Sequence, residues 1–279
     1  MKTHWKIPAV CLQLLLVLSL LLGTQVTVKA DQFEEGLAAY NAGNYQKALE
    51  IFKSFAEQGD VNAQHNLGAI YKINQDYKES VKWYLKAAEQ GDVNAQLSLG
   101  YSYFEGRGVP QDYKESVKWY LKAAEQGDVN AQISLAGSYY AGQVIPQDYG
   151  QAVKWYLKAA EQGDANAQHN LGVMYNEGQG VPQDYKESVK WYLKAAEQGN
   201  ANAQQGLGAM YGYGKGVPQD YIQAHKWFNL SASRSQGKSH ETSVGDRNLA
   251  EERMTPAQVA EAQKLAREWM PKTWEELSQ

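Results

Sequence analysis

Few side chains in this sequence have the type and spacing that catalysis requires. Ser235-Gln236-Gly237-Lys238 has the Ser-x-x-Lys spacing in which a lysine can activate a serine nucleophile. The companion Ser-Asp-Asn and Lys-Thr-Gly elements of serine β-lactamases do not occur in the chain. We therefore interpret the pair as a chance match in a polar segment and predict that the protein is not an enzyme.

The sequence also offers no set of residues suited to a metal or a cofactor. Its only cysteine, Cys11, lies in the apolar N-terminal segment. His65 and His169 occupy the same position in repeats three apart, which we expect to separate them by about 25 Å, too far to share a metal ion. Glycine clusters such as Gly106-Arg107-Gly108 follow no strand pattern, so we interpret them as turns with positive φ. We predict neither metal nor cofactor.

The first thirty residues have the layout of a secretory signal peptide. Lys2 and Lys6 precede an apolar run over residues 9–22, and Val28-Lys29-Ala30 offers small or branched residues to a signal peptidase. A membrane anchor is the alternative, but this run is shorter than the roughly 20 residues that span a bilayer. We predict a signal peptide from Met1 to Ala30, a periplasmic or secreted protein, and no integral membrane span after cleavage.

The charge balance argues against nucleic acid as a partner. The chain has 27 basic and 31 acidic residues, and removing the three lysines of the N-terminal segment leaves 24 basic against 31 acidic. A mildly acidic surface repels phosphate backbones and anionic headgroups. We expect neither nucleic acid nor an anionic membrane to be the main partner.

Repetition dominates the rest of the chain. The segment DYKESVKWYLKAAEQGD, residues 76–92, returns unchanged at 112–128, and a period of 36 residues separates the tryptophans Trp83, Trp119, Trp155, Trp191 and Trp227. Fixed periods of this length are typical of stacked repeat arrays. Each unit holds two helical patterns around a loop rich in glycine and proline, so each predicts a helical hairpin with a first helix A and a second helix B.

These units resemble the Sel-one-like repeat family, α-helical solenoids related to tetratricopeptides. The matching residues of one unit, around its Trp119-Tyr120 pair, are Gly91, Ala95, Leu99, Gly100, Tyr103, Gly106, Gly108, Asp112, Ala123 and Ala124. The third unit departs from the pattern, with Ala136 and Val144 in place of two glycines. The resemblance implies an all-α, right-handed superhelical solenoid of stacked hairpins with capping helices at both ends. It also implies protein interaction as the class of function, with no named partner.

The predicted organisation after the signal peptide has four parts. Residues 31–58 form a hairpin that resembles a tetratricopeptide unit, and five repeat units occupy residues 59–235. A polar linker is expected over residues 236–245, before C-terminal capping helices over residues 246–279. Thr255, Pro256 and Gln258 provide the start of a helix in that last part.

Differences between the copies are concentrated on one face of helix A. Counting from the glycine that opens each unit, positions 5, 9 and 13 hold packing residues, while positions such as 7 and 11 change. Positions 7 and 11 lie about 200° around the helix from positions 5 and 9. By resemblance this face lines a concave groove, and its candidate partner-binding residues are Leu97, Tyr101, Phe104, Ile133, Tyr140, His169, Val173, Asn176, His65 and Lys72.

Three functional hypotheses are compatible with these observations. The leading one is a monomeric scaffold that binds a protein or peptide partner, with Tyr101, Phe104 and Tyr140 as anchors. Its structural alternative is that Leu97 and Phe104 only pack against an adjacent helix. The second hypothesis is an envelope hydrolase of β-lactamase or cell-wall-peptide type, because some cysteine-rich relatives in the family have been described in this way. The third is a released factor that interacts with a host cell.

Overall fold

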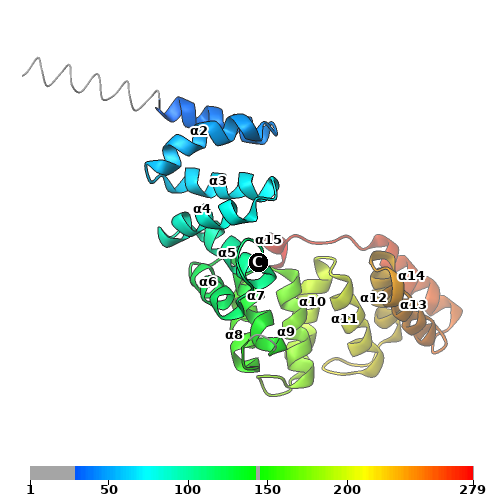
Figure 1. Cartoon of the computed structure of the whole chain (residues 1–279). Coiled ribbons are helices and arrows are strands. Elements are labelled where there is room, and N and C mark those ends of the chain that lie inside the picture. Colours follow the sequence, from blue (N-terminus) through cyan, green and yellow to red (C-terminus); the bar gives the residue numbers. More distant parts are fainter. Residues whose placement is uncertain (1–28, 143–144, 279) are drawn as a thin grey trace, which may run out of the picture. The chain divides into compact units, whose positions relative to one another are not determined.

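The computed structural model describes residues 29–142 and 145–278 (Figure 1). The predicted signal peptide lies almost entirely outside these residues, as does Val144. Within the described ranges the regular elements are all helices, and none of them is long and apolar enough to cross a membrane.

Consecutive helices pair as antiparallel hairpins. The A helices are α3 (Val61–Ile73), α5 (Val93–Glu105), α7 (Val129–Ala141), α9 (Ala165–Glu177) and α11 (Ala201–Tyr213). The B helices are α4 (Tyr77–Glu89), α6 (Tyr113–Glu125), α8 (Tyr149–Glu161), α10 (Tyr185–Glu197) and α12 (Tyr221–Arg234). Residues 29–41 are helical and precede α2 (Tyr45–Glu57), and the chain continues after α12 with α13 (Gly237–Glu251), α14 (Pro256–Glu268) and α15 (Trp274–Leu277). The predicted all-α array of hairpins is confirmed.

The chain forms two compact units, Met1–Asp112 and Tyr113–Gln279. In the first unit α2 packs on α3 and α4 packs on α5. In the second unit α6 packs on α7, α8 on α9, and α10 on α11, and α12 packs on both α13 and α14. Each unit is therefore a stack in which the B helix of one hairpin contacts the A helix of the next.

Each B helix buries one face that is made of aromatic and small residues. In α6 the buried residues are Ser116, Trp119, Tyr120, Ala123 and Ala124. An indole that buries about 150 to 250 Å² contributes roughly 4 to 6 kcal/mol gross, as an upper bound. The facing A helix makes room for the tyrosine with a glycine, because a Cβ on Gly172 would lie 2.5 Å from the ring of Tyr192. The tyrosine ring of the B helix thus packs directly against the backbone of the A helix at this glycine.

Capping residues begin the helices where the sequence places them. The Asp92 carboxylate accepts a hydrogen bond from the Ala95 N–H at 2.6 Å. Thr255 and Gln258 form the predicted capping box of α14. On the B helices only half of a capping box forms: Asp184 accepts from the Glu187 N–H, but the Glu187 carboxylate pairs with Lys190 at 3.1 Å.

The loop glycines form turns with positive φ, as predicted. Gly178 ends α9 with φ of 71°, and Gly180 follows with φ of 74°. A Cβ on Gly180 would lie 2.4 Å from the carbonyl oxygen of Tyr149, at the start of the preceding B helix. The loop therefore packs against the neighbouring hairpin, where only glycine fits.

The C-terminal region differs from the expected linker. Residues 237–245, assigned from their polarity to a linker over 236–245, belong to α13. Ser243 is buried, and its hydroxyl lies 2.9 Å from that of Ser231 on α12. Ala250 packs with Ala224 and Phe228. The segment is helical because small residues, not large apolar ones, form the face that packs on α12.

A buried glutamine on each A helix connects the hairpins. The Gln168 amide donates to the Ala160 carbonyl at the end of α8, at 3.1 Å, and its oxygen accepts from Gln198 at the end of α10, at 2.8 Å. The same three-part contact recurs with Gln132, which accepts from Gln162 at 2.9 Å, and in the first unit with Gln64, which accepts from Gln90 at 2.8 Å. We call this contact the glutamine clasp. It gives the Ala160 carbonyl at the helix end, which also accepts from the Gly163 N–H at 3.1 Å, a further hydrogen bond from the next hairpin.

The last copy of the clasp is incomplete and provides a matched control. Gln204 donates to the Ala196 carbonyl at 3.1 Å, but Arg234 stands where the next glutamine would be, and the Gln204 side-chain oxygen is buried without a hydrogen-bond partner. Gln168 and Gln204 are both fully buried. The two positions therefore differ by one hydrogen bond in similar surroundings.

We predict that Gln168→Met lowers the free energy of unfolding by about 2 kcal/mol and Gln204→Met by about 1 kcal/mol, because both lose the bond to a helix-end carbonyl but only the first also removes the acceptor of the Gln198 amide. Urea denaturation followed by circular dichroism measures the difference. Equal losses in the two variants would contradict the clasp as a two-sided contact.

Candidate functional site

In the first unit the predicted surface residues of α5 are exposed. Tyr101 and Phe104 retain 43% and 37% of their accessible surface, while Leu97 is half-buried. Tyr101 and Lys72 line the same hollow of about 350 Å³, with Tyr77, Ser98, Glu105 and Arg107 among its other walls. The Arg107 guanidinium lies over the Tyr77 ring at 5.8 Å. This hollow between α3 and α5 combines aromatic surface with a mixed charged rim.

His65, the remaining predicted residue of this unit, has a packing role. Its ring lies edge-on to Tyr84 at 5.7 Å, and its Nδ1 lies 2.9 Å from the Asp92 carboxylate. Burial alone would raise the pKa of Asp92, but hydrogen bonds from His65 and the Ala95 N–H lower it. The histidine thus supports the ionised cap of α5.

The predicted residues of the second unit are less exposed. Tyr140 packs against Tyr149 at 5.4 Å, and burial raises the pKa of Tyr140. Val173 packs against the core, and Ile133 and Asn176 are half-buried. His169 lies 5.9 Å from the Tyr192 ring, and burial lowers its pKa. In this unit the predicted face supports the packing of the hairpins and offers little exposed aromatic surface.

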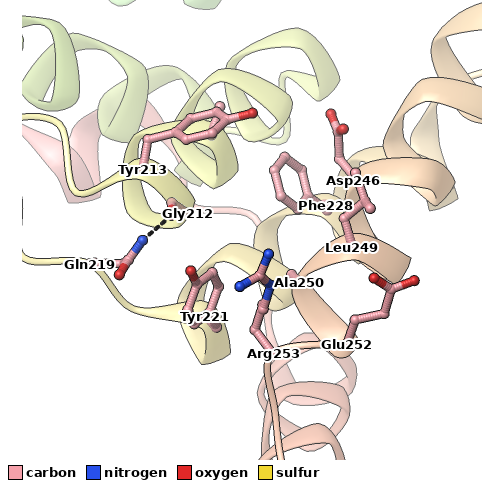
Figure 2. Close-up of a pocket in the computed structure, with 11 residues that line it drawn as sticks. Gly212, Tyr213, Gln219, Tyr221, Phe228, Asp246, Leu249, Ala250, Glu252 and Arg253 are labelled. Atoms are coloured by element: carbon pink, nitrogen blue, oxygen red, sulfur yellow. Dashed lines mark hydrogen bonds between the residues drawn. The ribbon is translucent and has the colours of Figure 1, made fainter.

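A hollow in the second unit lies where the sequence predicted small or linker residues. It has a volume of about 300 Å³ and lies between α11, α12 and α13. Figure 2 shows Tyr213 and Tyr221 on one side, Leu249 and Asp246 on the other, and Phe228 between them. Tyr213 and Leu249 are 76% and 60% exposed. This hollow extends the A-helix side of the stack, because α13 occupies the place of a further A helix.

Sequence reasoning missed this hollow for a local reason. Tyr213 lies at a position that varies between copies, but the neighbouring variable residues Ala209 and Gly212 are small and gave no sign of a binding surface. The opposite wall comes from α13, whose packing was not expected. The one feature of the sequence that could have indicated this hollow is Tyr213, a large aromatic residue at a variable position of the A helix.

The Ser-x-x-Lys pair does not lie on one helix. Ser235 ends α12, where its hydroxyl donates to the Ser231 carbonyl at 2.9 Å. Lys238 lies exposed in the first turn of α13. A helix would place residues three apart on one face, but the break between α12 and α13 separates these two. The arrangement gives no support to the hydrolase hypothesis.

These observations define an α-helical repeat protein built from stacked hairpins. The sequence matches the Sel1 repeat over residues 33–60, 61–92, 93–128, 129–164, 165–200 and 201–235, so the chain belongs to the Sel1 repeat family. Six repeats are therefore present. The first match, residues 33–60, covers most of the hairpin predicted over residues 31–58, which is therefore a repeat of the same family.

Two solved structures are similar over most of the chain. One is c5321, described as a protective antigen present in uropathogenic Escherichia coli strains and displaying an SLR fold, with 33% identity and a TM-score of 0.73. That match covers 89% of this chain and 54% of c5321, so this chain spans about half of the longer protein. The other is a Sel1 repeat protein from Oxalobacter formigenes, with 31% identity, a TM-score of 0.72, and coverage of 84% and 98%. Comparison with curated proteins gave no match.

A buried histidine beside the C-terminal helices gives this region a pH dependence. His225 on α12 is 1% exposed, and its two ring nitrogens have no hydrogen-bond partner among the described residues. Its Nε2 lies 3.5 Å from the Glu251 carboxylate, and Arg247 and Arg267 line the same hollow. Burial lowers the pKa of His225, and Glu251 offsets only part of that effect. The folded protein therefore favours the neutral imidazole.

We predict that stability falls as the pH decreases through the ordinary histidine pKa of about 6.5, because the unfolded chain binds a proton there that folded His225 resists. His225→Leu should weaken this dependence and keep stability near neutral pH. Thermal unfolding between pH 7.5 and 5, monitored by circular dichroism, measures it. A variant with the full wild-type dependence would exclude His225 as its source.

Proposed function

We propose that this protein is a periplasmic or secreted, non-enzymatic scaffold that binds a protein or peptide partner through the exposed face of its A helices. The single observation that carries the proposal is the exposure of Tyr101 and Phe104 on α5, beside the hollow that Tyr101 lines. Solvent-exposed aromatic side chains beside a hollow with a charged rim are typical of binding hot spots.

The packing within each unit supports this choice of face. In the first unit α3 contacts α5 directly, and in the second unit α9 contacts α11. Neighbouring A helices therefore lie close enough for one extended ligand to touch two repeats at once. Sel1 repeat proteins typically act as non-catalytic interaction scaffolds, and the apolar signal-like segment at residues 1–30 supports export.

The two hollows differ in charge, which suggests different ligand chemistry at each. Lys72, Glu105 and Arg107 surround the hollow of the first unit, and Asp246, Glu252 and Arg253 surround that of the second. The first rim has one more basic than acidic group and the second has one more acidic than basic. We propose that the first hollow favours an acidic segment of the partner and that the second hollow favours a basic segment.

Site-specific photo-crosslinking tests the proposed face. A photoreactive phenylalanine at Tyr101 should capture a partner in intact cells, whereas the same residue at Leu193, a 38% exposed position on the B helix α10, should not. With the captured partner purified, Tyr101→Ala with Phe104→Ala should weaken binding by at least about tenfold, as expected for two hot-spot aromatics.

Leu193→Ala is the matched control, because it also removes exposed apolar surface and should leave the affinity unchanged. Circular dichroism checks that all variants are folded. Wild-type affinity in a folded Tyr101→Ala, Phe104→Ala protein would refute the proposed face, whatever partner is found.

A further inference from the structure

The C-terminal segment of the chain lies along the edge formed by the turns between hairpins (Figure 1). After α14 the chain is extended and runs back past α12 and α10. Trp269 packs against Trp227 with ring centroids 6.3 Å apart, and the Arg234 guanidinium lies over the Trp269 ring at 4.5 Å. The segment that follows, residues 271–274, binds the end of α10.

Four contacts hold residues 271–274 at this edge. The Lys272 N–H donates to the Glu197 carbonyl at 2.8 Å, and the Lys272 ammonium pairs with the Glu197 carboxylate at 3.1 Å. The Trp274 ring lies against the Cα of Gly163, where a Cβ would approach it to 2.5 Å. The Lys194 ammonium lies between two indoles, 4.7 Å from Trp191 and 5.5 Å from Trp274. We call Gly163, Lys194 and Glu197 the tail site.

Copies of the tail site recur in both units: Gly127, Lys158 and Glu161 repeat it in the second unit, and the first unit contains another. The sequence WYLKAAEQG, residues 191–199, recurs as residues 83–91, so Lys86 and Glu89 correspond to Lys194 and Glu197, and Gly59 corresponds to Gly163. Gly59 and Gly163 have φ of 96° and 97°. The loop between α3 and α4 is four residues shorter than the loop between α5 and α6. It lies at the opposite end of the hairpin from Gly59 and Glu89, so it does not change the site. We call Gly59, Lys86 and Glu89 the open site.

The glutamine clasp fixes both copies in the same way. At the open site Gln90, next to Glu89, donates to Gln64 at 2.8 Å and to the Gly59 carbonyl at 3.3 Å. At the tail site Gln198, next to Glu197, donates to Gln168 at 2.8 Å. In each case the glutamine after the B helix binds the A helix of the same hairpin, and the glycine of the site lies just before that A helix.

The two copies differ in what covers them. The Glu197 side chain retains only 14% of its accessible surface, and Lys194 and Gly163 are half-buried. Glu89, Lys86 and Gly59 are all exposed, and a Cβ on Gly59 would meet no atom within 4 Å. The Lys86 ammonium already lies over Trp83 at 4.2 Å, so a second indole would complete the arrangement seen around Lys194.

We propose that the open site binds an extended segment of another protein that carries a basic residue two positions before a tryptophan. Residues 271–274 of this chain, Pro-Lys-Thr-Trp, show the chemistry of the occupant. Its main-chain N–H donates to the Glu89 carbonyl, its basic side chain pairs with the Glu89 carboxylate, and its indole covers Gly59 and Lys86. The chain's own tail is held at the tail site by its covalent connection and by Trp269, so the occupant comes from a different protein.

A peptide probe tests this proposal on the full chain. The probe is a blocked synthetic peptide of residues 268–277, added to protein labelled with ¹⁵N at glycine. Millimolar peptide should shift the amide signals of Gly59 and Gly91 and leave that of Gly163, already covered by Trp274, unchanged. No shift at Gly59 and Gly91 would overturn the proposal.

Variants on both partners identify the contacts. Replacing the second tryptophan of the peptide by alanine should weaken binding by about tenfold or more, because the indole supplies most of the buried surface. Glu89→Lys should weaken binding by about threefold to tenfold, the range of an exposed ion pair turned repulsive. Changing the peptide lysine to glutamate should restore part of the affinity for Glu89→Lys.

Two further measurements separate the alternatives. Glu50→Lys, which reverses an exposed carboxylate on α2 in the same unit, should bind the peptide as the wild type does; an equal loss in this control would show a non-specific charge effect and overturn the site. Sedimentation velocity should show no dimer. A dimer that Trp274→Ala dissolves would assign the open site to a second copy of this chain and overturn the proposal of a different partner.

Discussion

The glutamine clasp is the contact on which the arrangement of hairpins depends. A helix ends with carbonyl groups that have no partner inside the helix, and packing the next hairpin over them removes water. Gln168 donates to one such group, the Ala160 carbonyl, which also accepts from the Gly163 N–H, and Gln198 of the following B helix then binds the Gln168 oxygen. One side chain thus fixes the distance between three consecutive helices. Apolar packing supplies the stability, but it does not define the register in this way.

The clasp also explains why one stretch of sequence is copied so faithfully. The alanines, tryptophan and tyrosine of the B helix are buried, and the glutamine after it binds the A helix of the same hairpin. Nearly every residue of DYKESVKWYLKAAEQGD has a structural partner. The A helices are under a weaker constraint on their outer face, where Tyr101 and Phe104 are exposed in the first unit. The same repeated frame still presents Lys194 and Glu197 at its edge, and the C-terminal tail uses them.

The C-terminal end shows how the stack is closed without a further repeat. Helix α13 packs on α12 through Ser243 and Ala250, and α14 contributes Ala266 to the core that contains Trp227. His225 is buried in this region, and its ring nitrogens have no hydrogen-bond partner among the described residues. The polar surroundings of His225, with Arg247 and Glu251, contrast with the apolar floor of the neighbouring hollow in Figure 2. The end of the stack is thus the part whose chemistry departs furthest from the repeat.

The sequence by itself determined the hairpins, their buried Trp–Tyr and Ala–Ala stripe, the aspartate caps and the glycine turns. These features are local: the period of the helix and the special conformations of glycine and aspartate fix them within a few residues. Only the tertiary structure decided which polar residues are buried and which aromatic residues are exposed. Gln168 needs a hydrogen-bond partner 30 residues away. Tyr140 is partly covered because it packs against Tyr149, whereas Tyr101 remains exposed. The helix α13 was missed for the same reason, because its small residues gain their packing role only against α12. Burial of a side chain depends on what the rest of the fold brings to it, and the pattern of one helix does not contain that information.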